Sequence, residues 1–160
     1  MLTIESQPRP HPAPDEVLIS VVAAGVNRAD ILQRQGHYPA PEGTPPWPGL
    51  EVSGTVAAVG DQVSRWSVGD RVCALVPGGG YAEYVAAAQG AVLPVPHGLD
   101  VTAAAGLVEA ACTVWSNLQA ADAQPGQTVL IHGGSGGVGT VGIQIAKAAG
   151  MQVITTARGP

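Results

Sequence analysis

Positive charge is scarce in this chain of 160 residues and is not concentrated anywhere. Lysine and arginine together number 7 against 12 aspartates and glutamates, so the formal net charge is −5. Proteins that bind nucleic acid or anionic membrane surfaces usually present patches of lysine and arginine, and this sequence has none. We therefore expect neither nucleic acid nor a membrane among the partners.

Long apolar runs are also missing. No stretch approaches the roughly 20 apolar residues that a membrane-spanning helix needs. The N-terminal segment Met1-Leu-Thr-Ile-Glu-Ser6 lacks the basic region and apolar stretch of a secretory signal. The two cysteines, Cys73 and Cys112, are too few for a disulfide framework, and we expect both to be buried free thiols. These features together predict a cytoplasmic protein.

Glycine and proline, by contrast, are abundant, with 22 and 14 residues. They divide the first hundred residues into short β-type runs, and Asn27 can cap a short helix over 28–35. Gly54 lies inside one of these runs and predicts a bulge or a close approach of two backbones. Short strands at this spacing predict a compact, partly open β-barrel. The expected strands cover residues 17–24, 51–59, 71–76, 81–86 and 91–95, and a further run over 63–68 lies between two turn signals.

A helical stretch follows the β-rich part. Thr102 can cap a helix that runs to about Ala121, with an interruption near Leu107. Residues 122–127 then form a linker with the turn signal Pro125-Gly126.

The most informative motif is the glycine turn Gly134-Ser135-Gly136-Gly137-Val138-Gly139. An apolar β-type run over 129–131 precedes it, a helical pattern over 140–149 follows, and a second β-type run covers 152–157. A GxGxxG motif between a strand and a helix is typical of dinucleotide-binding folds. The alternative is an ordinary glycine-rich loop.

Each glycine of this motif has a physical role in such a fold. Gly134 allows the tight turn, Gly136 lets a pyrophosphate approach the backbone, and Gly139 lets the helix pack on the strand. The helix N-terminus supplies free N–H groups and partial positive charge for the phosphates. We therefore take all six residues of the turn as candidate cofactor-binding residues.

A complete Rossmann sheet has about six strands, and only two can be placed in this chain. We therefore expect the cofactor domain to be incomplete here. The expected organisation is a β-rich domain over 1–100, a connecting helical region over 101–126 and the first part of a nucleotide-binding domain over 127–160.

Four segments, in this order, resemble signatures of the medium-chain dehydrogenase/reductases. They are Gly25-Val-Asn-Arg-Ala-Asp30, Pro48-Gly-Leu-Glu-Val-Ser-Gly54, Val68-Gly-Asp-Arg-Val72 and His132-Gly-Gly-Ser-Gly-Gly-Val-Gly139. The resemblance implies an α/β fold with a β-rich part, in which a GroES-like β-barrel is followed by the first βαβ unit of a Rossmann fold.

The zinc enzymes of that superfamily carry a cysteine ligand after the first glycine-valine turn and a Gly-His-Glu on the following strand. Asn27 and Leu50 stand at the positions of that cysteine and histidine. Asparagine is a poor zinc ligand and leucine cannot be one, and the four histidines have no metal-ligand spacing. We expect no metal site.

The zinc-free branch that the chain resembles is that of the NADPH-dependent quinone oxidoreductases related to ζ-crystallin. The residues that carry this resemblance are Gly25–Gly36, the following Tyr38-Pro39, and the loop Pro77–Tyr84. It implies hydride transfer from NADPH to a small-molecule quinone without a metal, and a homodimer of the full-length parent.

The same resemblance implies roles for three side chains. Asn27 would line the nicotinamide site and Tyr38 its mouth, as the catalytic residues, and Thr113 would bind the nicotinamide region. Simpler roles stay open: helix capping for Asn27, and packing or bonding to the helix backbone for Tyr38 and Thr113.

Arg158 bears on the choice of nicotinamide cofactor. Enzymes that use NAD tend to place an acid about 20 residues beyond the glycine turn, where it binds the ribose diol. Arg158 lies 19 residues after Gly139, and a guanidinium suits the 2′-phosphate of NADPH. The alternative is an exposed arginine near the end of the chain.

Two rival functions remain open at this stage. An enoyl-thioester or alkenal reductase shares the fold and cofactor of the quinone reductases. The chain by itself is also compatible with an inactive folded fragment whose cofactor site is incomplete.

Overall fold

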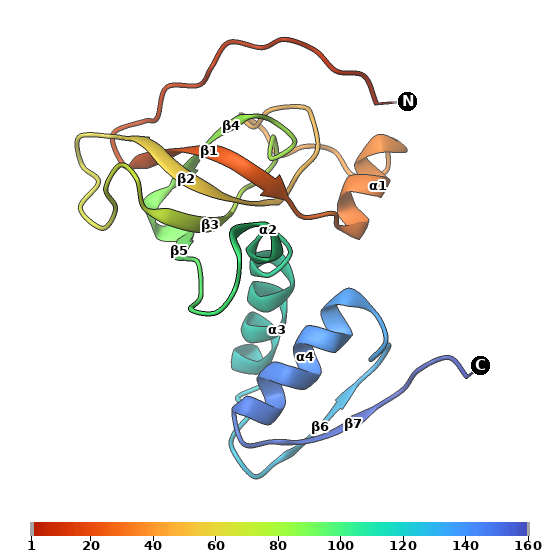
Figure 1. Ribbon diagram of the computed structural model, residues 1–160. Helices are drawn as coiled ribbons and strands as arrows, with labels where there is room; N and C mark the ends of the chain where they lie inside the picture. Colours follow the sequence, from red (N-terminus) through yellow and green to blue (C-terminus); the bar gives the residue numbers. More distant parts are fainter. Residues whose placement is uncertain (1, 160) are drawn as a thin grey trace. The chain divides into compact units, whose positions relative to one another are not determined.

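The computed structural model describes residues 2–159, which form two compact units that meet in the sequence between Val108 and Glu109 (Figure 1). The described residues contain no helix that combines the length and the apolar character needed to cross a membrane. The first unit contains β1 (Glu16–Ala24), α1 (Arg28–Arg34), β2 (Glu51–Val59), β3 (Arg71–Leu75), β4 (Tyr84–Ala88), the 3₁₀ turn η1 (Gln89–Ala91), β5 (Val92–Pro94) and α2 (Val101–Ala104). The second contains α3 (Val108–Ala120), β6 (Thr128–Ile131), α4 (Gly137–Ala148) and β7 (Gln152–Thr155).

The first unit is built on one antiparallel sheet with the strand order β4-β1-β2-β3-β5. The pairing of β1 with β2 shifts register between Leu18 and Ile19 and again before Ala23, and such irregularities bend a strand. A Cβ on Gly54 would lie 2.0 Å from the carbonyl oxygen of Ser20. The close backbone approach predicted at Gly54 is therefore confirmed, and the curled sheet confirms the β-rich half-barrel.

The core of the first unit lies on one face of this sheet. Its residues alternate along the strands, as in Val17 and Ile19 of β1, because successive side chains of a strand point to opposite faces. On the other face Cys73 packs with Ala104 and Val108. The main core consists of Val17, Ile19, Val52, Val56, Val72, Ala74, Val76, Val85, Ala87 and Val92.

The helical region begins two residues earlier than the predicted cap. Asp100, not Thr102, caps α2: its Oδ1 accepts a hydrogen bond of 3.0 Å from the backbone N–H of Ala103. The prediction of Thr102 was wrong because Asp100 has the extended backbone of a cap and a carboxylate in reach of the first turn. The predicted interruption near Leu107 is confirmed by the turn between α2 and α3.

Three other local predictions need correction. β4 begins at Tyr84 rather than at residue 81, because the backbone N–H of Tyr81 donates to Pro48 in a neighbouring loop instead of to the sheet. Residues 63–68 form no strand and are held in irregular conformation, with the Trp66 indole donating to the Gln89 carbonyl. Cys73 is buried as predicted, but Cys112 is exposed; neither forms a disulfide bond.

The second unit contains the predicted strand-turn-helix-strand. β6 and β7 are parallel neighbours, and α4 lies along them (Figure 1). α4 begins at Gly137, three residues before the predicted start, because Gly136 takes the cap position. Leu130 pairs with Ile154 in register, and their side chains are 57% and 58% exposed. The sheet therefore presents an apolar face to solvent.

Candidate functional site

The predicted site residues belong to both units. Asn27 and Tyr38 lie in the first unit, whereas Thr113, the glycine turn and Arg158 lie in the second.

Asn27 occupies the cap position of α1, with an extended backbone at φ −115° and ψ 160°. Its backbone N–H donates to Asp30 Oδ2 over 2.7 Å. Its side-chain Nδ2 donates to Glu51 Oε1 on β2 over 2.9 Å. Asn27 is thus at the start of the helix, as the capping alternative requires, while its amide nitrogen binds an acid that is distant in the sequence.

Asp30 is the second acid of this group, and only 4% of its surface is exposed. Its Oδ1 accepts a hydrogen bond of 2.8 Å from the backbone N–H of Gly49, and its Oδ2 accepts from Asn27. Burial of a carboxylate is costly unless hydrogen bonds satisfy it, and these two donors do so.

Tyr81 completes the polar network of the first unit. Burial raises the pKa of its hydroxyl to about 12, and the charge of Asp30, a hydrogen bond to the Asp30 carboxylate and the charge of Glu51 act in the same direction. The hydroxyl therefore stays protonated at neutral pH and acts as a donor toward Asp30. We call Asn27, Asp30, Glu51 and Tyr81 the acid network.

Two glycines make room for the acid network. A Cβ on Gly25 would lie 2.2 Å from Glu51 Oε1. A Cβ on Gly49, which has a φ of +109°, would lie 2.4 Å from the Tyr81 nitrogen. Side chains at either position would push the network apart.

Tyr38 lies in the loop after α1, and 37% of its surface is exposed. The described residues include no hydrogen bond that joins its hydroxyl to Asn27 or Asp30. Its placement at the mouth of a nicotinamide site remains a prediction.

The glycine turn is crowded on one side and open on the other. A Cβ on Gly134 would lie 2.0 Å from Thr155 Oγ1, and one on Gly139 would lie 2.2 Å from the Gly133 carbonyl oxygen. A Cβ on Gly136 would meet nothing nearer than 3.3 Å, and one on Gly137 would meet nothing within 4 Å. Space is therefore open beside Gly136 and Gly137 at the start of α4, as the approach of a pyrophosphate to this backbone would require.

Two threonines at the end of β7 hold the turn. Thr155 Oγ1 donates to the Ile131 carbonyl over 2.8 Å. Thr156 Oγ1 accepts from the Gly133 N–H over 3.2 Å and lies 3.2 Å from His132 Nδ1. The ends of the two parallel strands are thereby tied together beside the turn.

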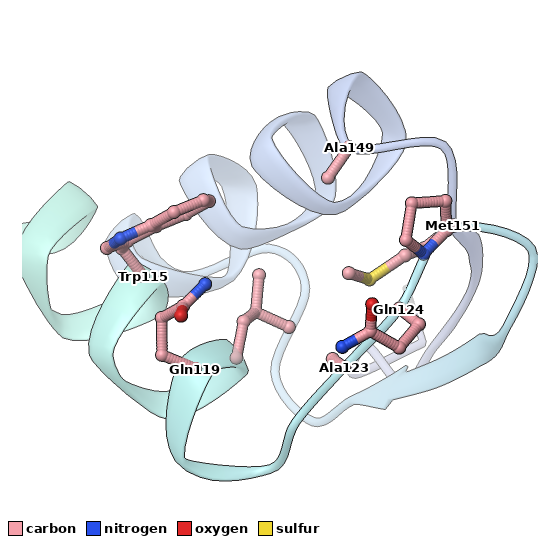
Figure 2. A pocket seen from close by; sticks show the side chains of 8 residues that line it. Trp115, Gln119, Ala123, Gln124, Ala149 and Met151 are labelled. Atoms are coloured by element: carbon pink, nitrogen blue, oxygen red, sulfur yellow. The ribbon is translucent and has the colours of Figure 1, made fainter.

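Two hollows lie in the second unit. Thr113 lines one of about 570 Å³ together with residues of α3, β6 and α4 such as Leu118, Ile131 and Val138. Figure 2 shows the other, of about 340 Å³, where Trp115 and Gln119 of α3 lie opposite Ala149 and Met151. Only the first contains a predicted cofactor residue. Arg158 is exposed beyond β7.

Metal-binding groups do not gather in the part of the chain that the structure describes. No three histidine, cysteine, aspartate or glutamate side chains lie there in an arrangement that could hold an ion. The absence of a metal from the working protein remains a prediction, which elemental analysis can test.

The sequence reasoning missed Asp30, Glu51, Tyr81, Thr155 and Thr156. Two of these residues could have been recognised from the sequence. Asp30 lies in a short helix and Glu51 at the start of an apolar strand, and acidic residues are rarely buried without a partner. The contacts of Tyr81, Thr155 and Thr156 join segments that are distant in the sequence, so only the folded structure identifies them.

Known proteins resemble the chain over nearly its whole length. The family model described as "Alcohol dehydrogenase GroES-like domain" matches residues 13–97. Mouse quinone oxidoreductase is 41% identical over 150 residues, which are 92% of this chain and 45% of that protein. The chain thus spans about half the length of this relative.

Two solved structures show the same fold. The quinone oxidoreductase from Thermus thermophilus, whose structure was also determined with NADPH, has a TM-score of 0.77 and 38% identity over 98% of this chain and 49% of that one. The CurK enoyl reductase has a TM-score of 0.85 and 35% identity over 96% of this chain and 49% of that one. The expected GroES-like, α/β fold is confirmed.

Proposed function

Because the chain belongs to the alcohol dehydrogenase GroES-like domain family of the medium-chain dehydrogenase/reductases, we propose that its residues serve hydride transfer from NADPH to a quinone without a metal ion. The observation that carries the proposal is the 41% identity with mouse quinone oxidoreductase, which extends over 92% of the chain. The activity belongs to a protein that contains these 160 residues and reaches the length of such relatives.

Within the first unit, Asn27 supplies the polar group for the quinone. Its amide is anchored on Glu51 by one N–H, and an amide nitrogen carries two. The second N–H is available to a carbonyl oxygen, on which negative charge develops as the ring is reduced. Tyr38, half-exposed in the loop after α1, is the second proposed donor.

Within the second unit, the glycine turn supplies the cofactor site. The open backbone at Gly136 and Gly137 would hold the pyrophosphate, and the exposed Arg158 would bind the 2′-phosphate. Thr113 would bind the nicotinamide region. The bound NADPH supplies the hydride, and the chain's own residues position the reactants rather than act as acid or base.

The test is a steady-state assay of a chain extended to the length of its relatives. We expect NADPH oxidation that depends on an added quinone, and we expect Asn27→Ala to lower kcat by about 100-fold, the effect typical of removing one donor to a developing oxyanion. Unchanged kcat in Asn27→Ala would rule out the role of this amide.

A second function is supported by the similarity to the CurK enoyl reductase, at a TM-score of 0.85. An enoyl thioester also accepts a hydride from a nicotinamide and also develops charge on a carbonyl oxygen, so the same Asn27 donor would serve it. Turnover of a quinone and of an enoyl thioester by the same preparation separates the two functions.

A further inference from the structure

The partner of the Asn27 amide determines which way that amide faces. An asparagine amide has a donor end and an acceptor end of nearly the same size, and its environment selects the orientation. Here the neighbour is the carboxylate of Glu51, at 2.9 Å, and a carboxylate accepts hydrogen bonds but does not donate them. Only the nitrogen end of Asn27 can face it.

Glu51 is itself held firmly enough to impose this choice. Only 2% of its surface is exposed, and its backbone carbonyl accepts from the Gly25 N–H over 3.1 Å. Gly25 leaves no space beside the carboxylate, since a Cβ there would lie 2.2 Å from Oε1. The charge of Glu51 also contributes to the raised pKa of Tyr81.

The main chain of Asn27 is fixed by the other acid. Its N–H donates to Asp30 Oδ2, and Asp30 is tied in turn to the Gly49 N–H. The backbone and the side chain of Asn27 are therefore held by two different buried carboxylates, on α1 and on β2. The bond to Asp30 belongs to the capping box of α1, whereas the bond from the side-chain amide to Glu51 reaches outside the helix and exceeds what capping requires.

We propose that Glu51 is a positioning residue for Asn27: its carboxylate binds one N–H of the amide, turns Oδ1 away, and keeps the second N–H as the donor to the carbonyl oxygen of the substrate. The catalytic use of this orientation rests on the proposed function; the orientation itself does not. In the opposite orientation the amide oxygen would repel the developing negative charge.

Glu51→Gln is the informative variant because it keeps the size of the side chain. A glutamine can accept from Asn27 through Oε1 or donate to it through Nε2, so both orientations of the Asn27 amide become possible. Glu16→Gln is the matched control: Glu16 lies on β1 of the same unit and accepts a bond from the Ala13 N–H, far from Asn27 in the sheet.

The direct readout is the side-chain amide of Asn27 in the 160-residue chain, followed by NMR. The sequence has only one other asparagine, Asn117, so Asn117→Asp assigns the signals. We expect one Nδ2 proton of Asn27 to be protected from solvent exchange in the wild type and in Glu16→Gln, and to lose most of this protection in Glu51→Gln. Equal protection of this proton in Glu51→Gln and the wild type would overturn the proposal. Fast exchange of both Nδ2 protons in the wild type would also overturn it, and this second measurement does not depend on whether a variant folds.

Kinetics of the extended chain supply the second readout. We expect Glu51→Gln to lower kcat by about tenfold with KM nearly unchanged, a smaller loss than removal of a whole oxyanion donor. An unchanged kcat would overturn the catalytic role of the orientation. A wild type that reduces no quinone would refute the proposed function instead, and the exchange measurement would still decide whether Glu51 positions Asn27.

Discussion

The backbone N–H of Gly49 donates to the buried carboxylate of Asp30 over 2.8 Å, across 19 positions of the sequence. This bond joins the short helix α1 to the residues that lead into β2. Asp30 thereby connects the segment that carries Asn27 with the strand that carries Glu51.

Asp30→Asn should destabilise the first unit. Asparagine keeps one acceptor oxygen, so one of the N–H groups of Gly49 and Asn27 would face an amide nitrogen and lose its partner. Hydrogen bonds to charged groups contribute about 1.5–3 kcal/mol, and we expect a loss of this order in the free energy of unfolding. Urea unfolding followed through the NMR signals of β1 and β2 measures it.

Asp61→Asn, which removes the same charge from an exposed turn, serves as the control. A free energy of unfolding that falls equally in the two variants would assign the effect to net charge and contradict the role of Asp30.

The hydroxyl of Tyr81 should titrate at a higher pH than that of a free tyrosine. Its pKa is raised from 10.0 to about 12 by burial, by the charge of Asp30 and by a hydrogen bond to that carboxylate. Because the unfolded chain loses this proton first, the stability that Tyr81 contributes is fully present below pH 10 and falls as the pH rises from 10 toward 12. Phenolate absorbance of the wild type should show a component near pH 12 that is absent from Tyr81→Phe. Identical titration curves of the two proteins would contradict the place of Tyr81 in the acid network.

Gly139→Ala should disturb the start of α4. The new Cβ would lie 2.2 Å from the Gly133 carbonyl oxygen, which is backbone and cannot swing aside. We expect a loss of about 1–3 kcal/mol in local stability, as for other overpacked sites. Amide exchange across β6, α4 and β7 of the extended chain measures it.

Gly137→Ala is the matched control, because a Cβ there would meet nothing within 4 Å. Its exchange rates should stay near those of the wild type. If the two variants behaved alike, the crowding at Gly139 would not be the cause.

Arg158 should set the cofactor preference of the extended protein. We expect a higher kcat/KM with NADPH than with NADH, and a loss of that preference by about tenfold to hundredfold in Arg158→Ser, since one charge-assisted contact to the 2′-phosphate disappears. Kinetics with both nucleotides decide this, and a wild-type preference for NADH would contradict the role of Arg158.

The 160-residue chain alone should bind NADPH weakly. β6 and β7 form a two-stranded sheet whose outer face exposes Leu130 and Ile154, and so small a sheet is marginally stable. We expect fast amide exchange from about residue 127 onward and protection in β1 and β3. Isothermal titration with micromolar affinity would contradict this expectation.

Much of the fold could be predicted from the sequence because short apolar runs and glycines determine the conformation of the backbone close to them in the chain. The apolar run over 129–131 predicted the strand β6, and Gly54 inside β2 predicted the close approach of two backbones. Asp100 was missed as a cap because two residues in that stretch have side chains suited to the role, and the backbone conformation decides between them.

The candidate site was predicted less completely, for a physical reason. Asn27 was recognised by its position in a motif, but its partners Glu51 and Asp30 act through hydrogen bonds across the fold. Tyr81 was assigned to a strand, whereas its backbone bonds to Pro48 and its hydroxyl to Asp30. No periodicity in the sequence encodes such contacts.

The most direct test of the central claim is the rate of NADPH oxidation by the extended protein with a quinone as acceptor, measured before and after dialysis against a chelator, with metal content determined on the same sample. We expect quinone-dependent turnover that the chelator leaves unchanged, in a protein without stoichiometric zinc. Stoichiometric zinc whose removal abolishes turnover, or reduction of an enoyl thioester without any reduction of quinones, would contradict it.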